Sequence, residues 1–388
     1  MKYQILFLDF FETNIDELIC FILTRTMSHD RDNLIFMNLP NTILYAISLI
    51  ALMGGFVIWD QSYWWASRDD YSFGYLVPLF SIYVLYDRKD IILDFIRGKS
   101  EDDGLSYSLE ITAVSKCADY LALIFFITGG LLFFIGGLLR AATMPQNPAT
   151  LAVSMGFSLV FLSTVFIFSK SILTDGNFTV PLKKRLAFTF LFLFPALIWL
   201  ISAPLVSVLE TKLRVFLLTQ VTIIVFTVMD TLGYVIERQG NVLLLPEGVV
   251  GVEEACSGIR SLTACLFAGS FLAAVYLKPF WKKLVLITMA MIFAIITNLF
   301  RSGFLTFYAY YNGSDAINEH WVLPLIGDIG SVHDVMGMAV LILTTMGLLI
   351  LLPIMNFDFQ AFANRLLEND SNSEKESIDI SSEDDLPK

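Results

Sequence analysis

A single thiol precedes an apolar run: Cys256 lies just before a stretch that begins at residue 259. If that stretch is a helix, its free N–H groups and the positive end of its dipole favour the thiolate, which is the nucleophilic form of cysteine. Gly258 leaves room for another backbone to approach, whereas Glu253 and Glu254 bring negative charge that opposes a thiolate. A lone cysteine in a membrane protein is more often a small buried apolar residue. Cys256 therefore needs partners before it counts as a nucleophile.

Two later segments carry groups that could work with a thiol. Asn298 and Arg301 are three residues apart near the end of an apolar run, so they share one face of a helix. Ser331 and Asp334 lie at the start of the last apolar run, where a hydroxyl can cap a helix and a carboxylate complements its dipole. His333 lies between them and could accept a proton. Considered alone, Arg301 is interpreted as a cation whose side chain extends to the lipid head groups. His333 alone is interpreted as a polar cap of the helix.

The three groups are more informative together than singly. Cys256, Arg301 and His333 lie at the start of one predicted membrane span, the end of the next and the start of the last. All three therefore fall on the same side of the membrane, whereas unrelated structural roles would scatter over both sides. The arrangement predicts a site that combines a thiol, a fixed cation and a base. His320, in the connection before the last span, is the competing histidine.

The composition is typical of a polytopic membrane protein. Of the 388 residues, 56% are hydrophobic and 16% are charged, with a mean hydropathy of +0.69; soluble domains carry about 25% charged residues. The cysteines do not form a disulfide framework, because they lie in separate segments, which leaves Cys256 as a free thiol. They are Cys20, Cys117, Cys256 and Cys265. We expect no metal, no cofactor and no binding of nucleic acid.

The distribution of charge divides the chain into three regions. Residues 1–41 contain apolar runs broken by acids, and we expect a cytoplasmic or interfacial extension there; Met27 or Met37 could be the true start. Residues 42–353 form the predicted transmembrane domain. Residues 354–388 are predicted to be a disordered cytoplasmic tail, because its acids alternate with Ser and Asn and cannot build a core. Much of the net charge of −12 lies in that tail.

About eight transmembrane helices are predicted, in an all-α fold. They cover residues 42–59, 73–86, 119–139, 149–169, 186–204, 259–277, 283–305 and 334–353. Lys and Arg are concentrated in the connections after the second, fourth and sixth spans and are sparse in the others. The positive-inside rule then places both termini in the cytoplasm and the Cys256 side outside.

The long connection before Cys256 is predicted to hold two further elements. Residues 215–229 are apolar but short for a ninth span, which would also place the later basic connection outside. We therefore expect an amphipathic helix over 206–232 on the outer membrane face. Three β-like runs follow, separated by glycine and proline, and they predict a small ribbon that leads into Cys256. The runs are 234–237, 241–245 and 249–252.

These motifs resemble those of the exosortase/archaeosortase family of membrane cysteine transpeptidases. The family's three elements are a Cys-Ser-Gly-x-Arg run, an Asn-x-x-Arg run and a histidine heading the final helix. They correspond here to Cys256-Ser257-Gly258-Ile259-Arg260, Asn298-Leu299-Phe300-Arg301 and His333-Asp334. The run from Gly74 to Pro78 is also similar, although this chain has Phe73 where the family commonly has His. The resemblance covers residues 42–353.

The resemblance implies an enzyme of the bacterial inner membrane that cuts PEP-CTERM-like sorting signals, each a short motif, a transmembrane helix and a basic end. Cys256 would attack the carbonyl just outside the bilayer and form a thioester. His333 would act as general base and then acid, and Arg301 would stabilise either the oxyanion or the thiolate. An amine, a lipid-linked acceptor or water would release the acyl-enzyme. The expected supporting residues are Ser257, Gly258, Arg260, Asn298 and Asp334.

Two other functions stay open at this point. A transporter would favour charged groups near the midplane and internally repeated halves, and the predicted spans show neither. A non-catalytic membrane scaffold in envelope or exopolysaccharide assembly would need none of the three site residues. Replacement of Cys256 distinguishes that scaffold from an enzyme.

Overall fold

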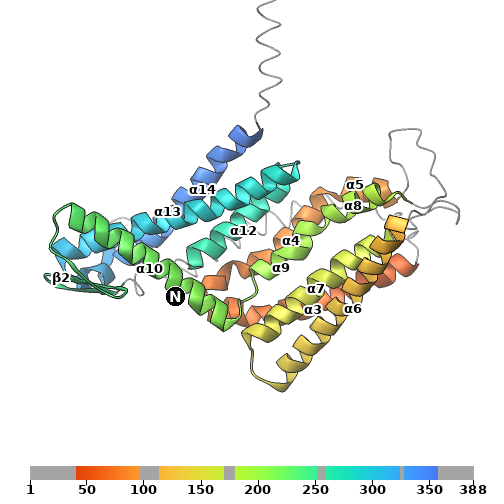
Figure 1. Ribbon diagram of the computed structural model, residues 1–388, viewed down its shortest axis with the longest axis horizontal. Helices are drawn as coiled ribbons and strands as arrows, with labels where there is room; N and C mark the ends of the chain where they lie inside the picture. The colour runs from red at the N-terminus through yellow and green to blue at the C-terminus, as the bar shows by residue number, and fades with distance from the viewer. Residues whose placement is uncertain (1–40, 97–112, 170–179, 252–258, 324–326, 357–388) are drawn as a thin grey trace, which may run out of the picture. The chain divides into compact units, whose positions relative to one another are not determined.

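The computed structural model describes residues 41–96, 113–169, 180–251, 259–323 and 327–356 (Figure 1). The chain divides into two compact units after Phe56, inside helix α3, and every contact discussed below lies within the second unit. Most of the predicted N-terminal extension and acidic tail lies outside the described residues. The helices are α3 (Asn41–Ser67), η1 (Asp69–Tyr75), α4 (Leu76–Asp87), α5 (Lys89–Ile96), α6 (Ala113–Ala142), α7 (Asn147–Phe168), α8 (Leu182–Leu191), α9 (Leu193–Ile201), α10 (Ser207–Thr231), α12 (Ile259–Tyr276), α13 (Phe280–Asn312), η2 (Asp315–Asn318) and α14 (Val332–Asn356). The strands are β1 (Glu237–Gln239), β2 (Val242–Leu245), β3 (Gly248–Gly251), β4 (His320–Leu323) and β5 (Gly327–Ser331).

Seven of the described helices are long and apolar enough to cross a membrane: α3, α6, α7, α10, α12, α13 and α14. The pair α8 and α9, bent by 45°, makes an eighth if it counts as one span. The protein is therefore an all-α polytopic membrane protein, as predicted. Several helices extend beyond the predicted spans, and α13 continues to Asn312.

Pro195 explains the bend between α8 and α9. A proline has no N–H for the carbonyl four residues earlier, so the carbonyl of Leu191 lacks its helical partner. Arg88, at the end of α4, donates one N–H to this oxygen and another to the carbonyl oxygen of Ala274, at 2.9 Å, in the last turn of α12. One guanidinium thus satisfies two carbonyls that helix geometry leaves unpaired.

The second predicted span is built from a 3₁₀ helix followed by an α-helix. η1 has 7 residues and α4 has 12; at ~2.0 and ~1.5 Å per residue, together they cover roughly 30 Å. Near the start of α12, the Thr263 hydroxyl donates to the carbonyl oxygen of Asp70 at 3.1 Å. Near its end, Ala274 accepts from Arg88. The two short helices therefore run beside most of α12.

Both ends of α10 contact the same side of the second unit. Near its start, Glu210 forms an ion pair with Arg68, which follows α3. Beyond its end, the Tyr234 hydroxyl lies 3.2 Å from the Tyr311 hydroxyl, near the end of α13. This is the side on which α12 starts and α13 ends, and we refer to it as the site side. These contacts indicate that α10 lies along the site side and does not cross the membrane beside the other helices.

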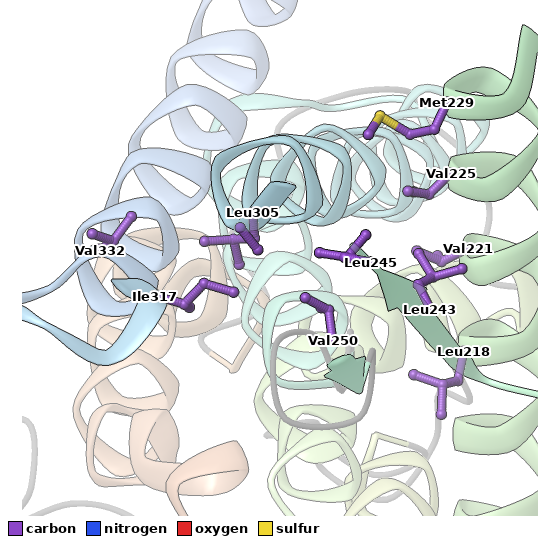
Figure 2. Close-up of a cluster of buried hydrophobic side chains, with 11 residues drawn as sticks. Leu218, Val221, Val225, Met229, Leu243, Leu245, Val250, Leu305, Ile317 and Val332 are labelled. Atoms are coloured by element: carbon purple, nitrogen blue, oxygen red, sulfur yellow. The ribbon is translucent and has the colours of Figure 1, made fainter. Parts of the chain in front are cut away.

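The buried face of α10 packs on an antiparallel ribbon of order β1-β2-β3 (Figure 2). The same cluster includes Leu305 of α13 and Val332, the first residue of α14, which is 1% exposed. Apolar side chains such as Phe216, Ile223 and Val228 also lie on the exposed face of α10, most of them between Lys212 and Asp230. The predicted ribbon and the bounds of the helix are confirmed, with β1 starting later than predicted. The prediction that the helix is amphipathic is wrong, because apolar side chains lie on both its buried and its exposed face.

The two carbonyls bound by Arg88 predict a loss of stability. We expect Arg88→Met to lower the free energy of unfolding by about 2–4 kcal/mol, because each unpaired buried carbonyl costs about 1–3 kcal/mol. Thermal unfolding of the purified full chain in detergent micelles measures this, with Lys89→Met as the neighbouring control. Pro195→Ala restores an N–H for Leu191, so the cost of Arg88→Met should be smaller in that background. An equal cost in both backgrounds would contradict the assignment.

Candidate active site

The predicted cation and the predicted base are in direct contact. Nη2 of Arg301 lies 2.9 Å from Nε2 of His333 and donates to the His333 carbonyl oxygen at 3.2 Å. A guanidinium can only donate, so the ring contact uses the lone pair of Nε2 and leaves the ring proton on Nδ1. Nδ1 lies 3.4 Å from Oδ1 of Asp334, which accepts that proton's hydrogen bond. The basic nitrogen of His333 therefore lies on the side of Arg301.

Ser331 and Asp334 fix the backbone at the start of α14. The Ser331 hydroxyl oxygen accepts a hydrogen bond from the Asp334 N–H at 3.2 Å. In return, Oδ2 of Asp334 accepts from the Ser331 hydroxyl at 2.8 Å and from its N–H at 3.3 Å. This reciprocal pattern is a capping box, and it confirms the cap predicted for Ser331. It holds the turn that carries His333.

A second β-hairpin, which the sequence analysis missed, leads the chain into His333. Strands β4 and β5 pair antiparallel, with His320 opposite Ser331. The competing histidine is therefore a cross-strand neighbour of the α14 cap. Strands of four and five residues, one of them containing two glycines, carry little sequence signal for β-structure.

The start of α12 lies at a depth similar to that of Arg301. Cys256, Ser257 and Gly258 lie outside the described residues, and α12 begins directly after them at Ile259. A Cβ atom added to Gly269 would meet the Cβ of Ala290 at 2.6 Å, which marks where α12 and α13 cross. From this crossing, Ile259 is about ten residues back along α12 and Arg301 about eleven residues on along α13, or ~15 and ~17 Å.

The other two described motif residues differ in their surroundings. Asn298 lies one turn before Arg301 on α13 and is 5% exposed. Arg260, the second residue of α12, points Nε toward Oδ1 of Asp70 at 3.5 Å, and its side chain is 59% exposed. Asn298 therefore belongs to the buried surroundings of Arg301, whereas Arg260 takes part in a different set of charges.

That set is an ionic cluster on the site side, which we did not predict. Two carboxylates, those of Asp70 and Glu210, contact three arginines. Glu210 pairs with Arg68 and, at 3.2 Å, with Arg214, while Asp70 lies 3.5 Å from both Arg214 and Arg260. The hydrogen bond that Arg68 donates to Glu210 raises the pKa of Arg68 and keeps the pair charged. The cluster ties the starts of α10 and α12 to η1.

A comparison with models of known protein families shows to which family the chain belongs. A family model described as transmembrane exosortase matches residues 64–351, more than half of the chain. The chain belongs to the transmembrane exosortase family. No curated protein and no solved structure matches it. In this exosortase the match runs from α3 to α14, and so includes the Arg301–His333 contact.

Phe73 of this exosortase takes part in packing. Its ring lies 5.0 Å from that of Phe267 on α12, and Phe80 stacks on Phe271 of the same helix at 4.0 Å. A Cβ atom added to the neighbouring Gly74 would lie 2.1 Å from the Trp65 ring. The residues around position 73 therefore pack η1 and α4 closely against α12 and against Trp65 of α3.

The capping box predicts a local effect on α14 of the exosortase. Ser331→Ala should destabilise the first turn by about 0.5–2 kcal/mol and speed amide hydrogen exchange over residues 332–335, measured by mass spectrometry. Thr345→Ala is the control, because this hydroxyl donates within α14 to the Leu341 carbonyl, far from the cap. Unchanged exchange in Ser331→Ala would contradict the role of the cap.

Proposed function

We propose that this exosortase is a membrane-embedded cysteine protease or transpeptidase that cleaves the C-terminal sorting signals of secreted proteins. The observation that carries the proposal is the Arg301–His333 contact, at the depth where the chain passes from Cys256 into α12. A thiol nucleophile needs a base for its proton and a donor that stabilises the anion formed in the reaction. His333 and Arg301 supply these two functions.

In the proposed reaction, Nε2 of His333 takes the proton from the Cys256 thiol, and the thiolate attacks the scissile carbonyl. Collapse of the tetrahedral intermediate forms a thioester and breaks the peptide bond. The leaving amine takes the proton from His333. An amine, a lipid-linked nucleophile or water then attacks the thioester, with His333 again as the base, and the thiol is regenerated.

The observed contact favours a role for Arg301 at the oxyanion. In the free protein, Nη2 of Arg301 donates to the same lone pair of His333 that must accept the thiol proton. A substrate carbonyl that develops negative charge is a stronger acceptor than a neutral imidazole. Movement of Nη2 to that oxygen releases the base as the substrate binds. Asp334, which faces Nδ1, would stabilise the imidazolium that forms.

We also propose that the site side faces away from the cytoplasm and that both termini are cytoplasmic. The basic side chains of Arg88 and Lys282 contact Ala274 and Met355, at the opposite ends of α12 and α14 from the site, which agrees with the positive-inside rule. A substrate held by its own transmembrane helix would present its scissile bond on the site side. A membrane-impermeant thiol reagent added outside spheroplasts should label Cys256 but not Cys117; the reverse pattern would contradict this orientation.

Three substitutions should reduce cleavage to different degrees. Cys256→Ala should abolish it and Cys256→Ser nearly so, because a hydroxyl is a far weaker nucleophile without a stronger base. His333→Ala should slow it about 10²–10⁴-fold through lost proton transfer. Arg301→Lys should slow it about 10²–10³-fold, because an ammonium cannot reproduce the planar donor geometry at an oxyanion.

The assay co-expresses each variant with a tagged secreted protein that carries a sorting signal from the same genome and follows the uncut precursor. Protein level is matched by immunoblot. Wild-type clearance of the precursor by Cys256→Ala would show that the cysteine is not the nucleophile, and would favour a non-catalytic scaffold.

A further inference from the structure

Three buried polar atoms on neighbouring turns of α13 have no hydrogen-bond partner within the described part of the chain. They are Oδ1 of Asn298, Nε of Arg301 and Oγ of Ser302. Asn298 is 5% exposed and Ser302 is 2% exposed. Buried polar groups are nearly always paired in folded proteins, because an unpaired group has lost its water without replacement. Three such atoms on neighbouring turns indicate a partner from outside the described part of the chain.

The side chains of Asn298 and Ser302 lie one helical turn apart on α13, and Arg301 lies between them in sequence. Positions four apart are neighbours on a helix surface, so the side chains of Asn298 and Ser302 can contact the same ligand. Ala290 lies against Gly269 of α12. The buried residues of α13 are therefore apolar near its crossing with α12, at Ala290 and Ala294, and polar near Arg301, at Asn298 and Ser302.

The hydrogen-bonding capacities of the three atoms match those of one peptide group. The carboxamide oxygen of Asn298 can only accept, Nε–H of Arg301 can only donate, and the Ser302 hydroxyl can do either. A peptide group presents one N–H and one C=O. Such a site needs no particular side chain on its ligand. It also adjoins the reacting groups, because Nη2 of the same arginine contacts His333.

We propose that Asn298, Ser302 and Nε of Arg301 form a subsite that binds the main-chain peptide group next to the scissile bond of the substrate. Oδ1 of Asn298 accepts the substrate N–H, and the Ser302 hydroxyl and the Arg301 Nε–H donate to the substrate carbonyl oxygen. The inference rests on the proposed function, since it assumes a peptide substrate at this site. Binding there draws Arg301 toward the substrate, which couples recognition to release of the base.

The test uses the full chain in lipid vesicles and a synthetic peptide with the motif and transmembrane helix of one sorting signal. Asn298→Leu and Ser302→Ala each remove an unpaired group with little change of shape. We expect each to raise KM about tenfold and to change kcat less than about threefold, because the contact is made before the reaction begins. The unfolding temperature of the free protein should stay the same or rise.

Thr306→Val is the matched control. The Thr306 hydroxyl is buried on the same helix and already donates to the Ser302 carbonyl at 2.9 Å, so its loss should leave KM unchanged. Raised KM in Thr306→Val equal to that in Ser302→Ala would show a general disturbance of α13 and would overturn the subsite.

An ester in the substrate tests the N–H that Asn298 is proposed to bind. Replacement of the peptide N–H next to the scissile bond by oxygen should raise KM about tenfold for the wild type and leave KM unchanged for Asn298→Leu. An equal rise of KM in both enzymes would overturn the subsite. A lower unfolding temperature with normal KM in Asn298→Leu and Ser302→Ala would also overturn it, and would give these residues a structural role. Cleavage that survives Cys256→Ala would overturn the proposed function, and the subsite with it, so the two failures are distinguishable.

Discussion

The contact of Arg301, inside α13, with His333, at the start of α14, spans only 2.9 Å and requires that both helices reach the same depth. Helix α13 reaches this depth because it is long and continues beyond Arg301 to Asn312. Helix α14 does so through its start, which is fixed by the Ser331–Asp334 capping box and by Val332 in the buried cluster with α10. The ribbon and α10 thus have a clear structural role, because they hold the turn that carries His333.

Other buried polar groups in the described part of the chain show why the unpaired atoms on α13 are informative. The two further unpaired atoms there, Oδ2 of Asp60 and Oγ1 of Thr164, lie on two separate helices, α3 and α7. Gln61 donates to the Ser154 hydroxyl at 2.7 Å and accepts from the Ser202 hydroxyl at 2.7 Å. The Trp64 ring N–H donates to the Thr150 hydroxyl at 2.8 Å. Each pairing stabilises a polar side chain where water is absent, at the cost of fixing its position. Around Arg301 the pairing is incomplete, as expected for a site prepared for a ligand.

The sequence predicted the features that depend on local pattern. The apolar runs predicted the helices, Ser331 at the start of the last run predicted the cap, and the order of the spans predicted that Arg301 and His333 lie at the same depth. The prediction that α10 is amphipathic failed because it rested on the length of the apolar run 215–229 and on the charges of later connections, and neither reports how apolar residues are spread around the helix. The cluster of Glu210 with Arg68 joins residues far apart in the chain, and no local pattern could predict it.

The central claim is that Cys256 carries the substrate as a thioester while His333 and Arg301 manage its proton and charge. The most direct measurement is mass spectrometry of the purified full chain, quenched in acid during turnover of a sorting-signal peptide. The account predicts an adduct with the mass of the N-terminal peptide fragment, located on Cys256, removed by hydroxylamine and absent from Cys256→Ala. Continued cleavage with no adduct on Cys256 under conditions that preserve thioesters, or an adduct on another residue, would contradict it.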